Sequence, residues 1–244
     1  QVGDGQLLYR AWPAAGQFVD KPVDCVPIGM ANQPQVDGGG DGRFALTYVA
    51  GEASSGAIHA ISYADGQWQS SSTAVGNGKR PNIFVDAEDA IHLTWCSEDD
   101  EVRYAGNEET QTVSSLSCGS RPEINQDSQG TLHIVWFGKS VVDSNGRTQP
   151  QTLLYESTRV NNAWSEPTII SRTGTTTQPS VAATPTNLHL VWHNNLSGDG
   201  DIAYASFVPY SCEEYPLESI SQVAYDVARR PESRPEDNDI PYCQ

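Results

Sequence analysis

The stretch RPNIFVD at residues 80–86, followed by IHLTW at 91–95, is repeated along the chain. Each copy joins a proline-led apolar segment to a second segment that ends in an aromatic residue. In the three strongest copies, the second residue of this second segment is a histidine. The other copies are QPQV (33–36) with FALTY (44–48), RPEINQD (121–127) with LHIVW (132–136), and QPSV (178–181) with LHLVW (188–192). Self-similarity at a spacing of roughly 40–50 residues is typical of repeat architectures.

A second signature, apolar-x-Tyr, follows each copy, and a further apolar run with a preceding aromatic residue often comes after it. Clusters of Gly, Asn, Asp and Pro separate these runs, so each period holds four short β-like segments. The LHIVW segment is apolar at nearly every position, as expected for a strand that is covered on both faces. The pattern therefore predicts an all-β chain built as a β-propeller with four-stranded blades. The repeated tyrosines are expected to be equivalent core residues, at Tyr63, Tyr104, Tyr155 and Tyr204.

The repeats do not give a whole number of blades, because there are five apolar-x-Tyr segments but only four proline-led pairs. We expect about five blades within residues 1–212, the first of them incomplete at residues 6–28. The complete blades are expected to start near residues 33, 80, 121 and 178, with a proline opening each inner strand. Residues 213–244 are expected to form a short helix and an extended acidic tail. Either the ring stays open, or a partner or upstream sequence supplies the two missing strands.

Composition excludes several classes of protein. The net charge of −17 would repel a phosphate backbone, which argues against nucleic-acid binding. No apolar run approaches the roughly 18 residues of a membrane span. The chain begins at Gln1, so a mature form or a fragment is expected. Five cysteines without a CxxC pair indicate an extracellular or periplasmic protein with one or two disulfides, and the odd number leaves at least one thiol over.

The repeats over residues 7–205 resemble the sialidase-like, BNR-type repeats of secreted bacterial propellers. Those families carry an Asp-box hairpin, Ser-x-Asp-x-Gly-x-x-Trp, between their outer two strands. Here the hairpins are degenerate: Arg159 replaces the aspartate in one copy, and the copy at 62–68 is one residue short. The resemblance therefore implies the architecture, while the family's enzymatic activity does not follow from it.

Two arginines precede equivalent inner strands, Arg80 and Arg121, and are expected near one mouth of the central channel. Two guanidinium groups could bind an anion bidentately there, or form salt bridges between blades. The third arginine that the sialidase resemblance implies is missing, because Gln33 and Gln178 occupy the other equivalent positions. Trp12 has no counterpart in the other repeats and is a candidate for stacking on a sugar or anchoring a partner.

Three histidines recur at one position, His92, His133 and His189, but equivalent positions of successive blades lie too far apart to share a zinc ion. We expect them to be packing histidines with hydrogen-bond partners. The loop with Asp199 and Asp201 offers several hard oxygens, so it is a candidate Ca²⁺ site, against the alternative of plain solvated turns. The acidic loop at 98–101 is a similar candidate, and no other cofactor is expected.

Two functional hypotheses follow. The first is a secreted, non-catalytic propeller that serves as a binding or assembly subunit, with another protein chain completing or covering the open blade, or with a glycan as its ligand. The alternative is a carbohydrate-active enzyme, a sialidase-like glycoside hydrolase or lyase or a fragment of one, whose site lies at the channel mouth. No catalytic residue is singled out by either hypothesis.

Overall fold

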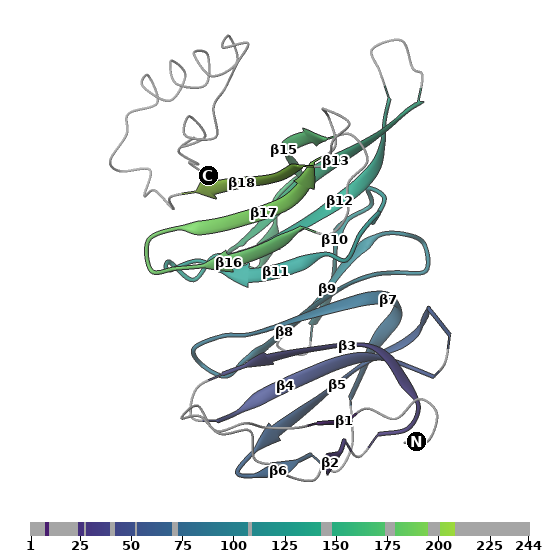
Figure 1. Ribbon diagram of the computed structural model, residues 1–244, viewed down its shortest axis with the longest axis vertical. Helices are drawn as coiled ribbons and strands as arrows, with labels where there is room; N and C mark the ends of the chain where they lie inside the picture. The colour runs from purple at the N-terminus through teal and green to yellow at the C-terminus, as the bar shows by residue number, and fades with distance from the viewer. Residues whose placement is uncertain are drawn as a thin grey trace. The chain divides into compact units, whose positions relative to one another are not determined.

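The computed structural model describes residues 8–9, 24–26, 28–39, 42–51, 53–69, 73–106, 109–142, 148–173, 179–194 and 201–207 (Figure 1). The chain divides into two compact units, unit 1 at Gln1–Thr112 and unit 2 at Val113–Gln244. Every regular element of the described residues is a β-strand, and every strand pair with a determined register is antiparallel. The all-β prediction is confirmed. No helix among these residues is long and apolar enough to cross a membrane.

Unit 1 contains two of the predicted repeats, which we call repeat I and repeat II. Their strands are hydrogen-bonded in the order β10-β9-β8-β7-β5-β4-β3, with β6 paired to β5. Repeat I comprises β3 (Ala31–Gly38), β4 (Phe44–Ala50), β5 (Gly56–Ala64), β6 (Gln67–Trp68) and the first part of β7 (Thr73–Val85). Repeat II comprises the rest of β7, β8 (Ile91–Cys96), β9 (Val102–Gly106) and β10 (Glu109–Ser114).

Strand β7 belongs to both repeats of unit 1. Its first part, up to Gly78, pairs with β5, and its second part, from Lys79, pairs with β8. The indole Nε1 of Trp95 donates a hydrogen bond to the carbonyl oxygen of Asn77 at 3.1 Å. A Cβ atom on Gly76 would overlap that indole, and one on Gly78 would overlap the carbonyl oxygen of Cys96. Only glycine therefore allows the continuous strand to pass this close to β8.

The prolines of unit 1 do not open their strands as expected. Pro34 lies inside β3 and Pro81 inside β7, each at a register shift that marks a β-bulge. A bulge accommodates proline because the ladder is locally interrupted, so no N–H is needed there. In unit 2, Pro122 and Pro179 directly precede the first residues of the inner strands, as predicted.

Unit 2 contains repeat III and repeat IV. Repeat III comprises β11 (Glu123–Gln126), β12 (Leu132–Val142), β13 (Thr148–Val160), β14 (Ala163–Trp164) and β15 (Thr168–Thr173). Repeat IV comprises β16 (Ser180–Ala183), β17 (Leu188–Asn194) and β18 (Asp201–Phe207). In repeat IV, and in repeat III as far as β14, consecutive strands pair as antiparallel neighbours, which is the meander that the sequence predicts; β15 pairs with β13.

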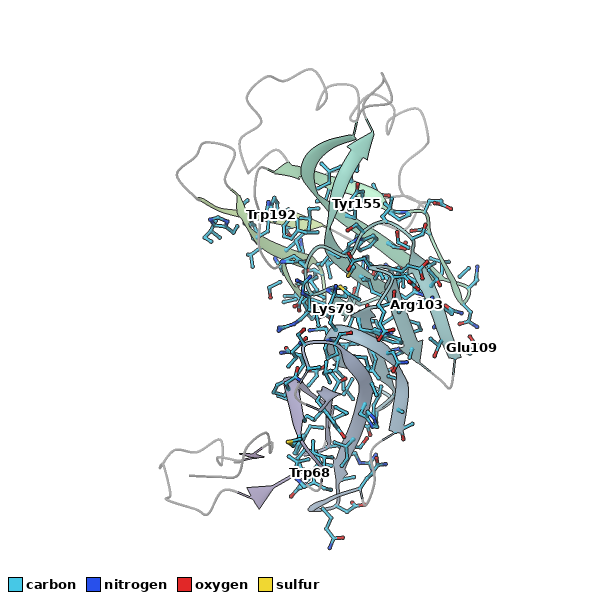
Figure 2. The ribbon with its side chains drawn as sticks, turned by 90° about the vertical axis from the view of Figure 1, so that its right-hand side faces the viewer. Trp68, Lys79, Arg103, Glu109, Tyr155 and Trp192 are labelled. Carbon is cyan, nitrogen blue, oxygen red and sulfur yellow. The ribbon has the colours of Figure 1, made fainter. Side chains whose placement is uncertain are left out.

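Each sheet has two faces because successive side chains of a strand alternate. We call the face that carries the repeated tryptophan the leading face, and the face that carries the repeated histidine the following face. In unit 1 the following face of repeat I, with Val49 and Ile58, packs on the leading face of repeat II, with Leu93 and Trp95. In unit 2 repeats III and IV pack the same way, and Trp192 of β17 joins this core (Figure 2). Apolar residues on both faces, as in LHIVW, thus serve two interfaces.

The N-terminal segment adds a two-stranded sheet, in which β1 (Leu8–Tyr9) pairs with β2 (Asp24–Cys25). Val26 and Ile28 then pack on the leading face of repeat I. The predicted helix and tail at 213–244 lie outside the described residues, and the division at residue 212 stays a prediction. Cys96 and Cys118 are disulfide-bonded, in line with the expected disulfide.

Candidate functional site

The X-Pro dipeptides of unit 1 adopt a strained backbone. Gln33 and Arg80, which precede the prolines of repeats I and II, have φ angles of 51° and 58°. A residue before proline favours the extended region, and a non-glycine residue in the left-handed region costs on the order of 1–3 kcal/mol. Such strain persists where the surroundings fix the backbone, and it clusters at functional sites. We call the end of the strands at which these dipeptides lie the proline end.

Hydrogen bonds fix both strained residues. The backbone N–H of Arg80 donates to Oε1 of Gln33 at 2.6 Å, which links the two repeats of unit 1 at the proline end. The Nε2 of Gln33 donates to the carbonyl oxygen of Ser54 at 2.8 Å. The Nδ2 of Asn32 donates to the carbonyl oxygens of Gly51 and Ala53. These bonds join the start of the inner strand to the loop between β4 and β5, so the Gln33 side chain that accepts the Arg80 N–H is itself fixed.

Charged side chains gather at the proline end of repeat II. Lys79 on β7 forms an ion pair with Asp100 at 2.8 Å, and Arg103 on β9 forms one with Glu101 at 2.7 Å. Figure 2 marks Lys79 and Arg103. Half-exposed pairs of this kind contribute little to stability. The two pairs do occupy two carboxylates of the acidic loop at 98–101, which we considered as a candidate cation site.

The second predicted arginine, Arg121, belongs to unit 2. It is half-buried, and its Nε is a buried donor that has no hydrogen-bond partner among the described residues. A buried polar atom without a partner points to a water or a ligand at that place. Since Arg80 lies in unit 1, the predicted convergence of the two guanidinium groups stays a prediction.

The other predicted site residues are Trp12, Asp199 and Asp201. Trp12 and Asp199 are outside the described residues, and Asp201 is the first residue of β18, with its side chain undescribed. The described part of the chain contains no group of three or more His, Cys, Asp or Glu residues that could hold a metal ion. Sugar stacking by Trp12 and Ca²⁺ binding by Asp199 and Asp201 therefore remain predictions.

The three repeated histidines each bridge a turn and a strand. In repeat II, His92 is buried, with Nε2 3.0 Å from Oδ2 of Asp86 and Nδ1 2.8 Å from the hydroxyl of Tyr104. Oδ1 of Asp86 also accepts the backbone N–H groups of Glu88 and Ala90. The aspartate therefore caps the turn between the first two strands of the repeat and anchors the histidine of the second, as expected for a packing residue.

Repeat III replaces the tyrosine of this set by a carboxylate. His133 lies between Oδ2 of Asp127 at 3.2 Å and Oε1 of Glu156 at 2.8 Å. Burial alone would lower the pKa of His133, but the hydrogen bonds and charges of Asp127 and Glu156 outweigh it and raise the pKa to about 9. For Asp127, burial acts to raise the pKa, and the bonds from His133, Thr131 and Gln129 lower it below its ordinary value. A buried imidazolium therefore sits between two carboxylates.

Repeat IV carries the third histidine on an open surface. His189 lies 2.8 Å from the hydroxyl of Tyr204 and 3.3 Å from the hydroxyl of Thr184, which takes the place of the turn aspartate. Tyr204 is 46% exposed, whereas Tyr104 is fully buried. Of the three histidines, His189 has the least buried surroundings.

Glu156 is the residue that the sequence pattern misses. Tyr104 pairs with Thr94 and Tyr204 with Val191, both two residues after a repeated histidine. Tyr155 instead pairs with Trp136, one position further, so Glu156 takes the equivalent place. A one-residue offset moves a side chain to the opposite face, and Tyr155 accordingly stacks on Trp136.

Tyr63 is also out of register. It pairs with Phe44, which directly precedes the repeated-histidine position on β4, whereas Tyr104 and Tyr204 pair with the residue two positions after the histidine. Of the four tyrosines predicted to be equivalent, only Tyr104 and Tyr204 occupy one structural position. Burial raises the pKa of Tyr155.

A cavity of about 480 Å³ lies in unit 1, lined by parts of β5, β7, β8, β9 and β10. Ile91 and Leu93 contribute apolar surface, and Ser62, Gln69 and Glu109 contribute polar groups. Ile91 begins β8, whereas Lys79 pairs with Cys96 at the other end of that strand. The cavity therefore lies away from the proline end, and it contains neither a histidine nor an arginine.

Comparison with known proteins gives matches in structure alone. No family model and no curated protein sequence matches the chain. An ulvan lyase of polysaccharide lyase family PL25 superposes with a TM-score of 0.54 at 12% identity, over 78% of this chain and 56% of the lyase. The same values hold for that lyase bound to -[GlcA(1-4)Rha3S]-.

The subtype N11 neuraminidase-like protein of A/flat-faced bat/Peru/033/2010 (H18N11) superposes with a TM-score of 0.53 at 13% identity, over 84% of this chain and 56% of that protein. The chain thus spans a little over half the length of these structures. At such identities the likeness concerns the fold, which is β-propeller-like.

Proposed function

We propose that the chain forms part of a carbohydrate-active β-propeller that binds an acidic glycan at the proline end. The observation that carries the proposal is the strained Gln33–Arg80 pair, held by a 2.6 Å hydrogen bond at equivalent places of two repeats. Backbone strain fixed in this way is a mark of functional sites. In a third repeat, Arg121 also precedes the proline, and its Nε has no hydrogen-bond partner among the described residues, which supports a role for this guanidinium group in binding an anion.

The guanidinium group defines the class of ligand. Arginine binds carboxylate and sulfate groups bidentately, with two parallel N–H···O bonds. The net charge of −17 opposes the approach of any anion, so binding must depend on the few cations at the site. An acidic glycan held in this way has its charge neutralised next to the bond to be cleaved, which serves either hydrolysis or elimination.

The comparisons favour the carbohydrate-active hypothesis over the non-catalytic subunit that was our first expectation. The superposed proteins are a polysaccharide lyase and a neuraminidase-like protein. We extend the proposal to a propeller of about five blades acting outside the cell. The disulfide-bonded Cys96 and Cys118 agree with an oxidising compartment.

A binding experiment tests the proposal. Acidic oligosaccharides, uronate-containing and sulfated, are titrated calorimetrically into the protein and into Arg80→Ala, Arg80→Lys and Arg121→Ala. We expect each alanine variant to lose about 10- to 100-fold in affinity, since hydrogen bonds to a charged group contribute about 1.5–3 kcal/mol. Arg80→Lys should recover only part of the loss, because lysine cannot bind bidentately. Release of reducing ends from the same glycans measures turnover.

The matched control is Arg43→Ala. Arg43 lies next to the turn between β3 and β4, at the opposite end of the strands, where it pairs with the carboxylate of Asp89 at 2.7 Å. Its removal changes the net charge as Arg80→Ala does, and it should leave the affinity unchanged. Equal losses in both variants, or no binding of acidic glycans by the unmodified protein, would refute the proposal.

A further inference from the structure

Repeat I lacks the histidine and tyrosine that face each other in repeat II. There, His92 on β8 and Tyr104 on β9 lie 2.8 Å apart. Ala45 and Ala60 occupy the equivalent places in repeat I. Strand pairing defines this equivalence, because Tyr104 pairs with the residue two positions after His92, and Ala60 with the residue two positions after Ala45. Two methyl groups therefore stand where an imidazole and a phenol stand in the next repeat.

Side chains of repeat II fill only part of the space that these small residues leave. Gly39, five residues after its proline, takes the place of the turn aspartate Asp86. A Cβ atom at Gly39 would overlap Oδ1 of Asp89 and crowd the side chain of Val85, so this part is occupied. Ala60, in contrast, lines the cavity of about 480 Å³ in unit 1. The missing tyrosine of repeat I thus leaves room for a ligand.

The cavity lies between the following face of repeat I and the leading face of repeat II. Ile91, Leu93 and Ala105 of repeat II line it, and Ala60 and Val75 line it from repeat I. All five belong to the apolar core between the two repeats or pack against it. Pockets for small ligands typically measure roughly 300–1,000 Å³ and have mostly apolar walls with a few polar groups. The size and the walls of this cavity are those of a small-molecule site.

Polar groups line the remainder of the cavity. Gln69 is fixed against Ser62, because its backbone N–H donates to the Ser62 carbonyl oxygen at 2.9 Å and its Oε1 accepts the Ser62 backbone N–H at 3.3 Å. The Nε2 of Gln69 has no hydrogen-bond partner among the described residues. Thr73 and Thr110 add hydroxyl groups, and Glu109, marked in Figure 2, adds a carboxylate. These groups include donors and acceptors of hydrogen bonds.

The lining residues exclude several classes of ligand. Among the described residues that line the cavity, none carries a positive charge, so an anion finds no partner. None is aromatic, so a quaternary ammonium group finds no cage. Glu109 is the one charged group of this set, and an exposed ion pair with a primary amine contributes little. A hydrocarbon would leave the polar groups unpaired.

We propose that this cavity binds a neutral mono- or disaccharide. The C–H groups of a sugar ring pack on Ile91 and Leu93, and its hydroxyl groups both donate and accept. They accept from Nε2 of Gln69, donate to the carboxylate of Glu109, and exchange hydrogen bonds with the hydroxyls of Ser62 and Thr73. The site lies away from the proline end, and it does not rest on the acidic-glycan site proposed there.

Nuclear magnetic resonance of methyl groups tests the proposal. The probes are glucose, galactose, xylose, arabinose and rhamnose, with disaccharides of each, added at millimolar concentration. At least one of them should shift the methyl resonances of Ala60, Ile91 and Leu93 in a saturable manner. The reference is Leu188, which is buried in repeat IV and should not shift. Absence of any saturable shift at the three cavity residues would overturn the proposal.

Two variants remove the site in different ways. Ala60→Tyr restores the side chain that repeat II carries and fills the cavity, so the affinity for the sugar should fall at least 10-fold. Gln69→Ala should lower it several-fold, and Gln69 is exposed, so this variant does not depend on the cavity accepting a tyrosine. The matched control is Gln67→Ala, an exposed glutamine of β6 outside the lining, which should leave the affinity unchanged. Unchanged affinity in Gln69→Ala, or an equal loss in Gln67→Ala, would refute the proposal.

Acidic oligosaccharides separate this site from the one at the proline end. Ala60→Tyr, checked for cooperative unfolding, should bind them as the unmodified protein does. Loss of both ligands in this folded variant would mean a single shared site and would overturn the inference. Binding of acidic glycans without binding of any neutral sugar would reject this inference alone. Binding of neutral sugars without acidic glycans would reject the proposed function and leave this site standing.

Discussion

His92 in repeat II and His133 in repeat III occupy the same place on equivalent strands, and each bonds an aspartate of the preceding turn. They differ in the third member of the set, which is the hydroxyl of Tyr104 in one and the carboxylate of Glu156 in the other. The pKa of His133 is raised to about 9 as a result. One side chain on the third strand therefore decides whether the histidine and the turn aspartate are joined by a hydroxyl or by a second carboxylate, which makes an ion triad.

Removing the histidine should separate the two sets most strongly. His133→Ala leaves two buried carboxylates without their cation, and we expect it to lower the free energy of unfolding by about 3–5 kcal/mol. His92→Ala deletes the same atoms but leaves only the carboxylate of Asp86, so its cost should be lower by about 1 kcal/mol or more. Urea unfolding of both variants measures the difference. An equal or larger cost for His92→Ala would contradict the charge argument.

The ion triad also predicts a pH dependence. The pKa of His133 is about 9 in the folded state against an ordinary 6.5, so its stabilisation is fully present below pH 6.5 and is lost as pH rises through 9. The loss amounts to at most roughly 3 kcal/mol. Asp127, whose pKa is lowered, acts in the acid range, where its contribution disappears as pH falls below its ordinary value of 3.8.

Unfolding at pH 6, 7.5 and 9.5 measures this dependence, with Glu156→Gln as the matched variant. Glutamine keeps the size of the side chain and removes the charge, so the fall in stability between pH 7.5 and 9.5 should shrink. The triad would not be an ion triad if the variant and the unmodified protein lost stability in parallel.

The smallest expected effects compare buried and exposed partners of a histidine. Tyr104→Phe leaves Nδ1 of the buried His92 without its partner and should cost about 1–3 kcal/mol. Tyr204→Phe removes the same hydroxyl from His189, but Tyr204 is 46% exposed and water can replace the hydroxyl, so the cost should stay below about 0.5 kcal/mol. Thermal unfolding of the isolated chain checks both.

Much of the fold could be predicted from the sequence because its signals are local. The proline of each repeat, with the histidine and tryptophan of repeats II to IV, marks the inner strands, and alternation then assigns the two faces. The register of the third strand could not be read in this way. Tyr155 matches the apolar-x-Tyr pattern, but pairing across a long hairpin places Glu156 on the histidine. A pattern of single residues cannot detect a one-residue offset that only strand pairing defines.

The ligand-binding role of Arg80 and Arg121 stays a prediction. The sequence singled out Arg80 and Arg121 by their equivalence, and the structure adds what spacing cannot contain: the left-handed backbone at Gln33 and Arg80, and the hydrogen bond that joins them. A bulge inside β3 and β7 was not foreseen, because a proline at the start of a strand and one at a bulge look alike in sequence.

The shared strand β7 has a consequence for how the protein folds. Linear arrays of repeats behave as chains of neighbours whose cooperativity depends on the coupling between adjacent members. Where repeats I and II meet, that coupling is a single unbroken strand, in which Asn77 receives the Trp95 indole between two glycines that admit no side chain. Opening one repeat must break the other's ladder, so both should exchange their amide hydrogens as one cooperative block.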